Sequence, residues 1–287
     1  MRKSIAILIL ASAAAPAEDL WDFLPELPPT SEISFNTGGD SNAGWNARLS
    51  ASISGPKAIQ FTGAVAANET ISEQARLQTR SWSAGISSDP LQTSSIGINY
   101  EEWGKKNALT IDTLEIPITW NLPAISLMLT PQQRKIYLQL KKPTAQGKEE
   151  LQVDSQGIGL DINWYINSEW SASAGYRHYN YSKNPTRLAT DYRAIIAFSP
   201  DTLQLASGLD QRQLNLGMSW SQAGTLVGID WLRATSAIDQ SRISTTTLYV
   251  SRNFSHNWRI DISGGMQNVP YEDSTLIFGN LGMAYEW

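Results

Sequence analysis

Segments in which apolar and polar residues alternate extend from Ser31 to the C-terminus, and clusters of Gly, Pro, Asn, Asp and Ser separate them. Alternation with a period of two places one kind of side chain on each face of a β-strand. Many short strands divided by turn residues are typical of sandwiches and barrels, so the pattern predicts an all-β fold. The predicted strands lie at about 31–37, 44–54, 57–67, 75–87, 93–103, 106–120, 121–142, 150–165, 168–181, 209–221, 224–235, 242–253, 257–266 and 275–287.

The last strand, within Ile277 to Trp287, ends abruptly on a tryptophan, although the last residues of a soluble domain are usually frayed. This strand resembles the C-terminal sorting signal of Gram-negative outer-membrane β-barrels; an edge strand of a soluble sheet is the alternative. The resemblance implies a transmembrane antiparallel up-and-down β-barrel in outer-membrane lipid, with both termini in the periplasm and with the barrel assembly machinery as a partner during biogenesis. The residues that carry the resemblance are Leu281, Met283, Tyr285 and Trp287.

The segment 121–142 decides the strand count. Its apolar residues occupy odd-numbered positions before Pro131 and even-numbered positions after it, so Pro131 marks either a turn or an irregularity within one strand. A turn would make the count odd, whereas bacterial single-chain barrels use even numbers, which favours one long strand with a β-bulge near Pro131. A similar change of phase predicts a second bulge near Asp112. The count is then about 14 strands, with 12 or 16 as alternatives.

Tryptophans gather next to the short turns that fall on the periplasmic side when strands are counted back from Trp287. Tryptophan is enriched at the interfaces between membrane and water, and a soluble sandwich gives no reason for such clustering at one end. The pattern therefore predicts a membrane girdle formed by Trp120, Trp164, Trp170, Trp220, Trp258 and Trp287.

The strand face opposite the tryptophans is polar. A charge in the hydrocarbon costs about 2–4 kcal/mol at the bilayer midplane, so this face is expected to line the barrel interior. The predicted pore-lining residues are Asp161, Asn163, Arg177, Gln213, Asn215, Asp230, Arg259 and Asp261.

The N-terminus has the pattern of an export signal. A basic start, a short apolar core and the small residues up to Ala17 predict a signal peptide at 1–17, with cleavage after Ala13 as the alternative. Residues 18–30 are expected to form a periplasmic lead-in, and residues 31–287 the barrel. In the longest connection, 182–209, apolar residues at helical spacing before Pro200 predict a short helix.

Composition and motifs argue against several kinds of partner and catalytic site. A net charge of −5 argues against a nucleic-acid partner, and a chain without cysteine has no thiolate metal site. Outer-membrane lipid hydrolases carry a strand histidine two residues before a serine; here Ser182 follows His178 by four residues, about 13 Å along a strand. We therefore predict no catalytic residues, no metal and no cofactor.

The functional hypothesis from the sequence is an outer-membrane pore for small polar solutes. A non-conducting barrel that acts as a structural or secretion partner is the main alternative, and a lipid hydrolase is a more distant one.

Overall fold

The computed structural model describes residues 31–56, 59–71, 76–88, 93–140, 150–183, 205, 209–268 and 275–287. The predicted signal peptide, the lead-in and the helix-forming residues of 182–209 lie outside this part. No helix among the described residues is long and apolar enough to span a membrane.

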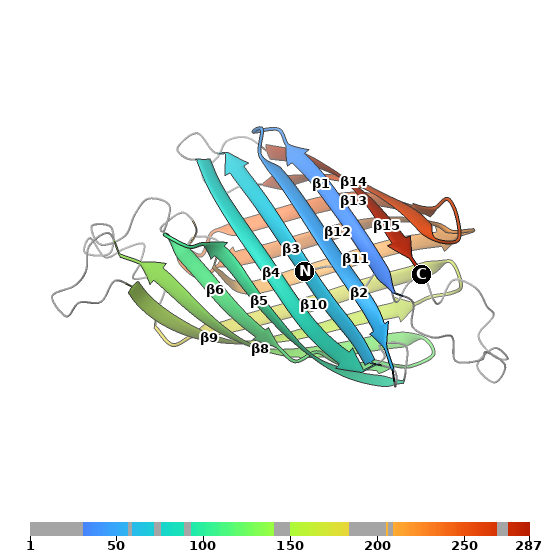
Figure 1. The fold of residues 1–287 in the computed structure, drawn as a ribbon, viewed down its shortest axis with the longest axis horizontal. Helices are drawn as coiled ribbons and strands as arrows, with labels where there is room; N and C mark the ends of the chain where they lie inside the picture. The colour runs from blue at the N-terminus through green and yellow to red at the C-terminus, as the bar shows by residue number, and fades with distance from the viewer. Residues whose placement is uncertain are drawn as a thin grey trace.

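Antiparallel strands follow one another in chain order around a single closed sheet (Figure 1). The first half contains β1 (Glu32–Asp40), β2 (Trp45–Gly55), β3 (Ile59–Ile71), β4 (Arg76–Ser88), β5 (Ser94–Lys105), β6 (Leu109–Glu115), β7 (Ile118–Asn121) and β8 (Ile125–Gln139). The second half contains β9 (Glu150–Tyr165), β10 (Trp170–Tyr181), β11 (Asp210–Gln222), β12 (Thr225–Ser236), β13 (Arg242–Asn253), β14 (Trp258–Asn268) and β15 (Thr275–Glu286).

The sheet closes because β1 pairs with β15 from Glu32↔Glu286 to Asp40↔Phe278. Segments β6 and β7 are two parts of one strand, since both pair with β5 on one side and with β8 on the other. The fold is therefore a closed antiparallel barrel of 14 strands, as the sequence predicts.

The two predicted bulges are wrong. Pairing between β8 and β9 runs without a shift from Ile125↔Trp164 to Gln139↔Glu150, with Pro131 inside the strand. The pairing of β6 and β7 with β8 is equally regular through Asp112. The interruption between β6 and β7 falls at Pro117, which has no N–H to donate. A register shift does occur elsewhere, between β11 and β12.

The change of apolar phase has a different cause, which is an exchange of polarity between the two faces. Before Pro131 the apolar residues of β8 point out of the barrel; after it, Ile136 and Leu138 point inward and are buried, while Lys135 points outward. Strand β9 shows the same exchange, because its outward residues change from Asp154 to apolar side chains beyond Gln156.

We call the part with mainly polar outward and mainly apolar inward residues the loop-end extension. It consists of residues 76–80, 101–105, 109–112, 133–139 and 150–156 of β4, β5, β6, β8 and β9. The remaining strand segments form the band section, whose outward face is mainly apolar. Large exposed residues on that face include Phe35, Leu49, Phe61, Ile86, Ile98, Leu160, Leu216, Ile229, Val250, Ile262 and Leu281.

The two ends of the barrel differ. The turn end holds Ser31, Trp287 and the connections after β2, β4, β7, β9, β11 and β13; Ser31 and Trp287 exchange two backbone hydrogen bonds there. The loop end holds the other connections, including the longest, 182–209. The extension lies at the loop end, where β8 and β9 have 15 and 16 residues, whereas β1 has only 9.

Candidate pore interior

Most side chains that point into the barrel are polar or small in the band section. The eight residues predicted to line a pore all occupy inward positions: Asp161, Asn163, Arg177, Gln213, Asn215, Asp230, Arg259 and Asp261. Many inward residues are partly accessible to solvent, among them Asn163, Asn215, Asp230 and Ser263. Their role in lining a pore remains a prediction.

One ion pair joins neighbouring strands across this wall. The Arg177 guanidinium on β10 lies 3.4 Å from the Asp161 carboxylate on β9, which is almost completely buried. Gly159 makes room for the arginine, because a Cβ there would lie 3.2 Å from Arg177 Cγ. The pair therefore lies along the wall.

Inward glycines elsewhere allow neighbouring side chains to lie flat. A Cβ at Gly175 would stand 2.3 Å from an oxygen of both Asp161 and Asn215. A Cβ at Gly157 would stand 2.4 Å from the Tyr179 ring. Such distances are far inside van der Waals contact, so these polar and aromatic side chains occupy the space that a β-carbon would fill. They cover the wall instead of extending toward the barrel axis.

Arg134 and Tyr179 form a second contact, which the sequence analysis did not identify. The guanidinium carbon lies 3.7 Å from the Tyr179 ring centroid, and a guanidinium N–H donates to the Tyr179 hydroxyl at 2.6 Å. Tyr179 is only 1% exposed. Arg134 lies just beyond Pro131, and the erroneous bulge there concealed its inward direction.

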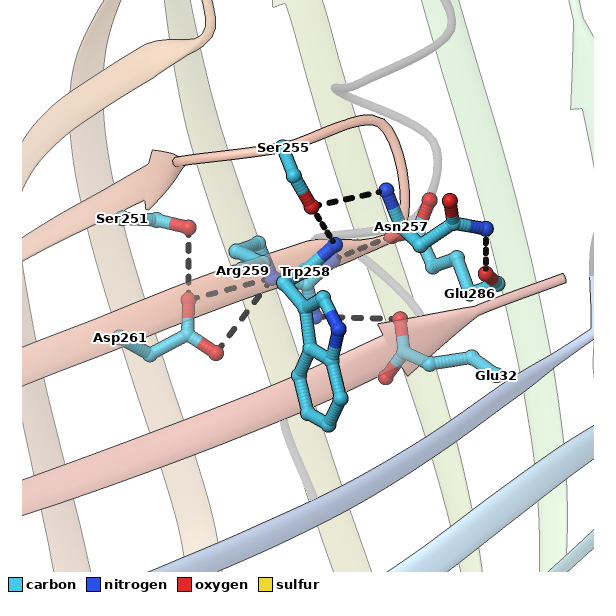
Figure 2. A network of polar contacts seen from close by, with 8 residues as sticks. All are labelled: Glu32, Ser251, Ser255, Asn257, Trp258, Arg259, Asp261 and Glu286. Carbon is cyan, nitrogen blue, oxygen red and sulfur yellow. Dashed lines mark hydrogen bonds and ion pairs between the residues drawn. The ribbon is translucent and has the colours of Figure 1, made fainter.

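At the turn end, Arg259 links three strands (Figure 2). The guanidinium lies 3.1 Å from the Glu32 carboxylate on β1, 2.9 Å from that of Glu286 on β15, and 3.3 Å from that of Asp261 on its own strand. The Ser251 hydroxyl donates to Asp261 at 2.6 Å. Because β1 and β15 are the first and last strands, this charged network fastens the closing seam of the barrel. The Arg259 guanidinium is thus held by three carboxylates, and the residue is only 6% exposed. Local sequence patterns could not reveal these partners.

The charges at inward strand positions are unbalanced. The acidic ones are Glu32, Asp40, Glu101, Glu115, Asp161, Asp210, Asp230, Asp261 and Glu286, and the basic ones are Arg48, Lys105, Arg134, Arg177 and Arg259. Acidic residues therefore outnumber basic residues on the inner wall.

Near the loop end the interior becomes apolar. A cluster of buried residues, here called the loop-end cluster, lies along one side of this region. It comprises Leu77, Ala108, Leu109, Ile111, Ile136, Leu138, Val153, Leu205, Leu209, Ala237 and Ile238, with Trp103, Leu140, Leu151 and Tyr181 packed against it. None of these residues is among the inward positions predicted from the sequence.

No protein-family model and no curated protein matches the chain. Among solved structures, the CymD monoaromatic hydrocarbon channel has a TM-score of 0.55 at 8% identity, over 91% of this chain and 90% of CymD. The chain therefore shares the β-barrel fold of this solved structure. The NanC porin has a TM-score of 0.48 at 9% identity, over 89% of this chain and 100% of NanC. The KdgM porin has a TM-score of 0.46 at 10% identity, over 89% of this chain and 99% of KdgM.

The six tryptophans predicted to form a girdle lie on the outer face of the barrel near its turn end. Trp120, Trp164 and Trp287 are between 42% and 55% exposed, and Trp170 and Trp258 somewhat less. Trp220 is half-buried and donates its indole N–H to Glu169 at 3.2 Å. Trp258 and Tyr285 pack with ring centroids 4.9 Å apart. Contact with lipid and a role of Trp287 in sorting remain predictions.

His178 and Ser182 hydrogen-bond to different partners. His178 points outward and its Nε2 lies 3.1 Å from the Asn180 side-chain oxygen. The Ser182 hydroxyl accepts a hydrogen bond from the backbone N–H of Asp154 at 3.0 Å. Among the described residues, no group of three or more His, Asp or Glu is placed to hold a metal ion.

Proposed function

We propose that this barrel is an outer-membrane pore through which small polar solutes pass. The observation that carries the proposal is the contrast across the wall of the band section. Its outward face is apolar and exposed, whereas its inward face is polar and partly accessible to solvent. A wall of this kind suits lipid on one side and water on the other.

We further propose that the turn end, with both termini, faces the periplasm and that the loop end faces outward. Short turns on the periplasmic side and longer loops outside are the usual arrangement of such barrels. The tryptophans at the turn end are placed as an interfacial aromatic belt would be. The exposed Trp287 and its neighbour Tyr285 are available to the barrel assembly machinery as a recognition signal.

Small cations are expected to pass more readily than small anions. Fixed charges lining a narrow pore act strongly on a passing ion, and acidic residues outnumber basic ones on the inner wall.

The alternative is a non-conducting barrel that serves as a structural or secretion partner. The buried loop-end cluster favours it, because apolar residues pack along one side of the interior there. The lipid-hydrolase hypothesis has no such support, since His178 and Ser182 bind different partners.

Planar-bilayer recording tests the pore. Purified protein should show channel events, at least in a variant with a weakened loop-end cluster such as Leu209→Ser. In the conducting protein Asp230→Asn should shift the reversal potential toward anions and Arg177→Gln toward cations. The matched control Asp112→Asn, at an outward position, should leave it unchanged. No channel events in either protein would refute the pore and favour the non-conducting barrel.

A further inference from the structure

Three arginines lie together on the outer face of the barrel, at the loop end of β11, β12 and β13. Arg212 on β11 and Arg242 on β13 are both directly opposite Thr235 on β12. Arg233 lies two residues before Thr235 on the same face, so it is a diagonal neighbour of both other arginines. Diagonal neighbours on paired strands lie roughly 7–8 Å apart. Arg212 and Arg242 are exposed and Arg233 is partly exposed; we call these three residues the arginine triad.

The arginine triad has no negative charge beside it on the outer face. All residues of β10 to β14 are described, and none of their outward positions carries Asp or Glu. The acids of these strands, Asp210, Asp230 and Asp261, point inward. Among the described residues, none forms an ion pair with a guanidinium of the triad. Asp239, in the turn after β12, accepts a hydrogen bond from the Ser241 backbone N–H at 3.0 Å.

Outward cations at the loop end of β4 and β8 differ, because they have acidic neighbours. Arg76 on β4 forms an ion pair with Glu69 on β3. Lys135 on β8 is directly opposite Asp112 on β6 and directly opposite Asp154 on β9. On the strands that the structure describes, unbalanced positive charge at the loop end of the outer face is therefore found on β11 to β13. Such a surface attracts an anion.

The triad borders the apolar outer face of the band section. Toward the turn end, the next outward residue is Leu214 on β11 and Trp231 on β12, and Arg233 is directly opposite Leu214. On β13 the outward face becomes apolar at Leu248, which is 61% exposed. An arginine can lay its aliphatic part on an apolar surface while its guanidinium stays in a polar layer. With the band section in lipid, as proposed above, the triad lies at the depth of lipid head groups.

From this placement we propose that the arginine triad binds the phosphate groups of an anionic lipid in the leaflet at the loop end. The proposal rests on the outer-membrane location proposed above and adds a lipid site to the barrel. Guanidinium groups stay charged and match the geometry of phosphate through paired N–H donors. The acyl chains of the same molecule cover the apolar face next to the triad. One lipid thus meets a basic surface at its head and an apolar surface along its chains.

Lipid binding to the purified barrel tests the proposal. The protein, in a neutral detergent, is titrated with diphosphoryl lipid A, and native mass spectrometry gives the dissociation constant. Arg212→Gln, Arg233→Gln and Arg242→Gln should each weaken binding about fivefold, and the triple variant about a hundredfold. The matched control Lys135→Gln removes an outward cation at the same end, but one with acidic neighbours, and should leave binding unchanged. Removal of both phosphates from the lipid should weaken its binding as much as the triple variant does.

Three results would overturn the lipid site. They are equal affinity of the triple variant and the unchanged protein, an equal loss in Lys135→Gln and in the triad variants, and displacement of the lipid by inorganic phosphate at the same concentration. The last result would show a site for a free anion. Electrophoretic mobility without heating shows that each variant is folded.

The lipid site and the proposed pore fail in different ways. The triple variant should conduct in planar bilayers as the unchanged protein does, because the triad lies outside the barrel. Loss of lipid binding with unchanged channel events leaves the pore standing. Absence of channel events in a protein that binds the lipid refutes the pore and leaves the lipid site standing.

Discussion

The band section and the loop-end extension are built from the same continuous strands, yet their faces have opposite polarity. On β9, Leu160 points outward in the band section and Gln156 points outward in the extension, with no shift of pairing between them. The inward residues change in the other direction, from Asp161 to Val153. The extension has the pattern of a soluble β-protein, apolar inside and polar outside. Side-chain polarity therefore follows the surroundings of each face and not the geometry of the strand.

The largest expected effect is the loss of packing inside the extension. Leu138 is 1% exposed, so Leu138→Ala leaves a cavity and should lower the free energy of unfolding by about 2–5 kcal/mol. Leu127→Ala on the same strand, at an outward band position, should cost less because lipid chains can fill the space. Urea unfolding of vesicle-inserted barrels measures both, and equal losses would show that the extension has no core of its own.

The second largest effect is expected from a charge placed on the outer face, which should destabilise the band section more than the extension. Leu160→Arg in the band should lower the free energy of unfolding by about 2–4 kcal/mol, since the guanidinium enters the bilayer interior. Gln156→Arg, four residues away on the same face, should cost between about 0 and 1 kcal/mol if it lies beyond the hydrocarbon. The same unfolding assay compares them. A large cost at Gln156 would place the extension within the membrane.

Sequence patterns predicted the barrel and its 14 strands because two-residue alternation is local. They failed at Pro131 and Asp112, where a change of apolar phase was attributed to bulges. From one strand alone, a bulge and an exchange of polarity look the same. Only pairing on both sides shows that Ile136 and Leu138 point inward in an unbroken register. The part of the loop-end cluster that lies on β6 and β8 was missed for this reason.

The candidate pore interior was predictable in part, because the alternation of inward and outward residues along a strand is also local. Parity along a strand placed Arg259 on the inward face, and the structure has it there. Its partners Glu32 and Glu286 lie at the opposite ends of the barrel-forming sequence. Barrel closure brings them together, and no local spacing predicts that contact.

A smaller loss of stability is expected when the charged network at the turn end is broken. This network joins the first and last strands at the seam of the barrel. Arg259→Gln removes charge-assisted bonds to Glu32 and Glu286 and should lower the free energy of unfolding by about 1.5–3 kcal/mol. The control Arg252→Gln, at an exposed outward position on β13, should stay within about 0.5 kcal/mol of the unchanged protein. Similar values for both variants would show that the network does not hold the seam.

A spin-label scan along β9 tests the central claim most directly, namely that the band section encloses water and the extension encloses an apolar core. Single cysteines from 150 to 164 carry a nitroxide, and collisions with oxygen and with a water-soluble nickel complex are measured in lipid vesicles. Outward positions from 158 to 164 should favour oxygen, and outward positions from 152 to 156 should favour nickel. The inward position 163 should be reached by nickel, and Val153 by neither reagent. Protection of position 163 from nickel would contradict a water-filled pore, and nickel collisions at Val153 would contradict the apolar core.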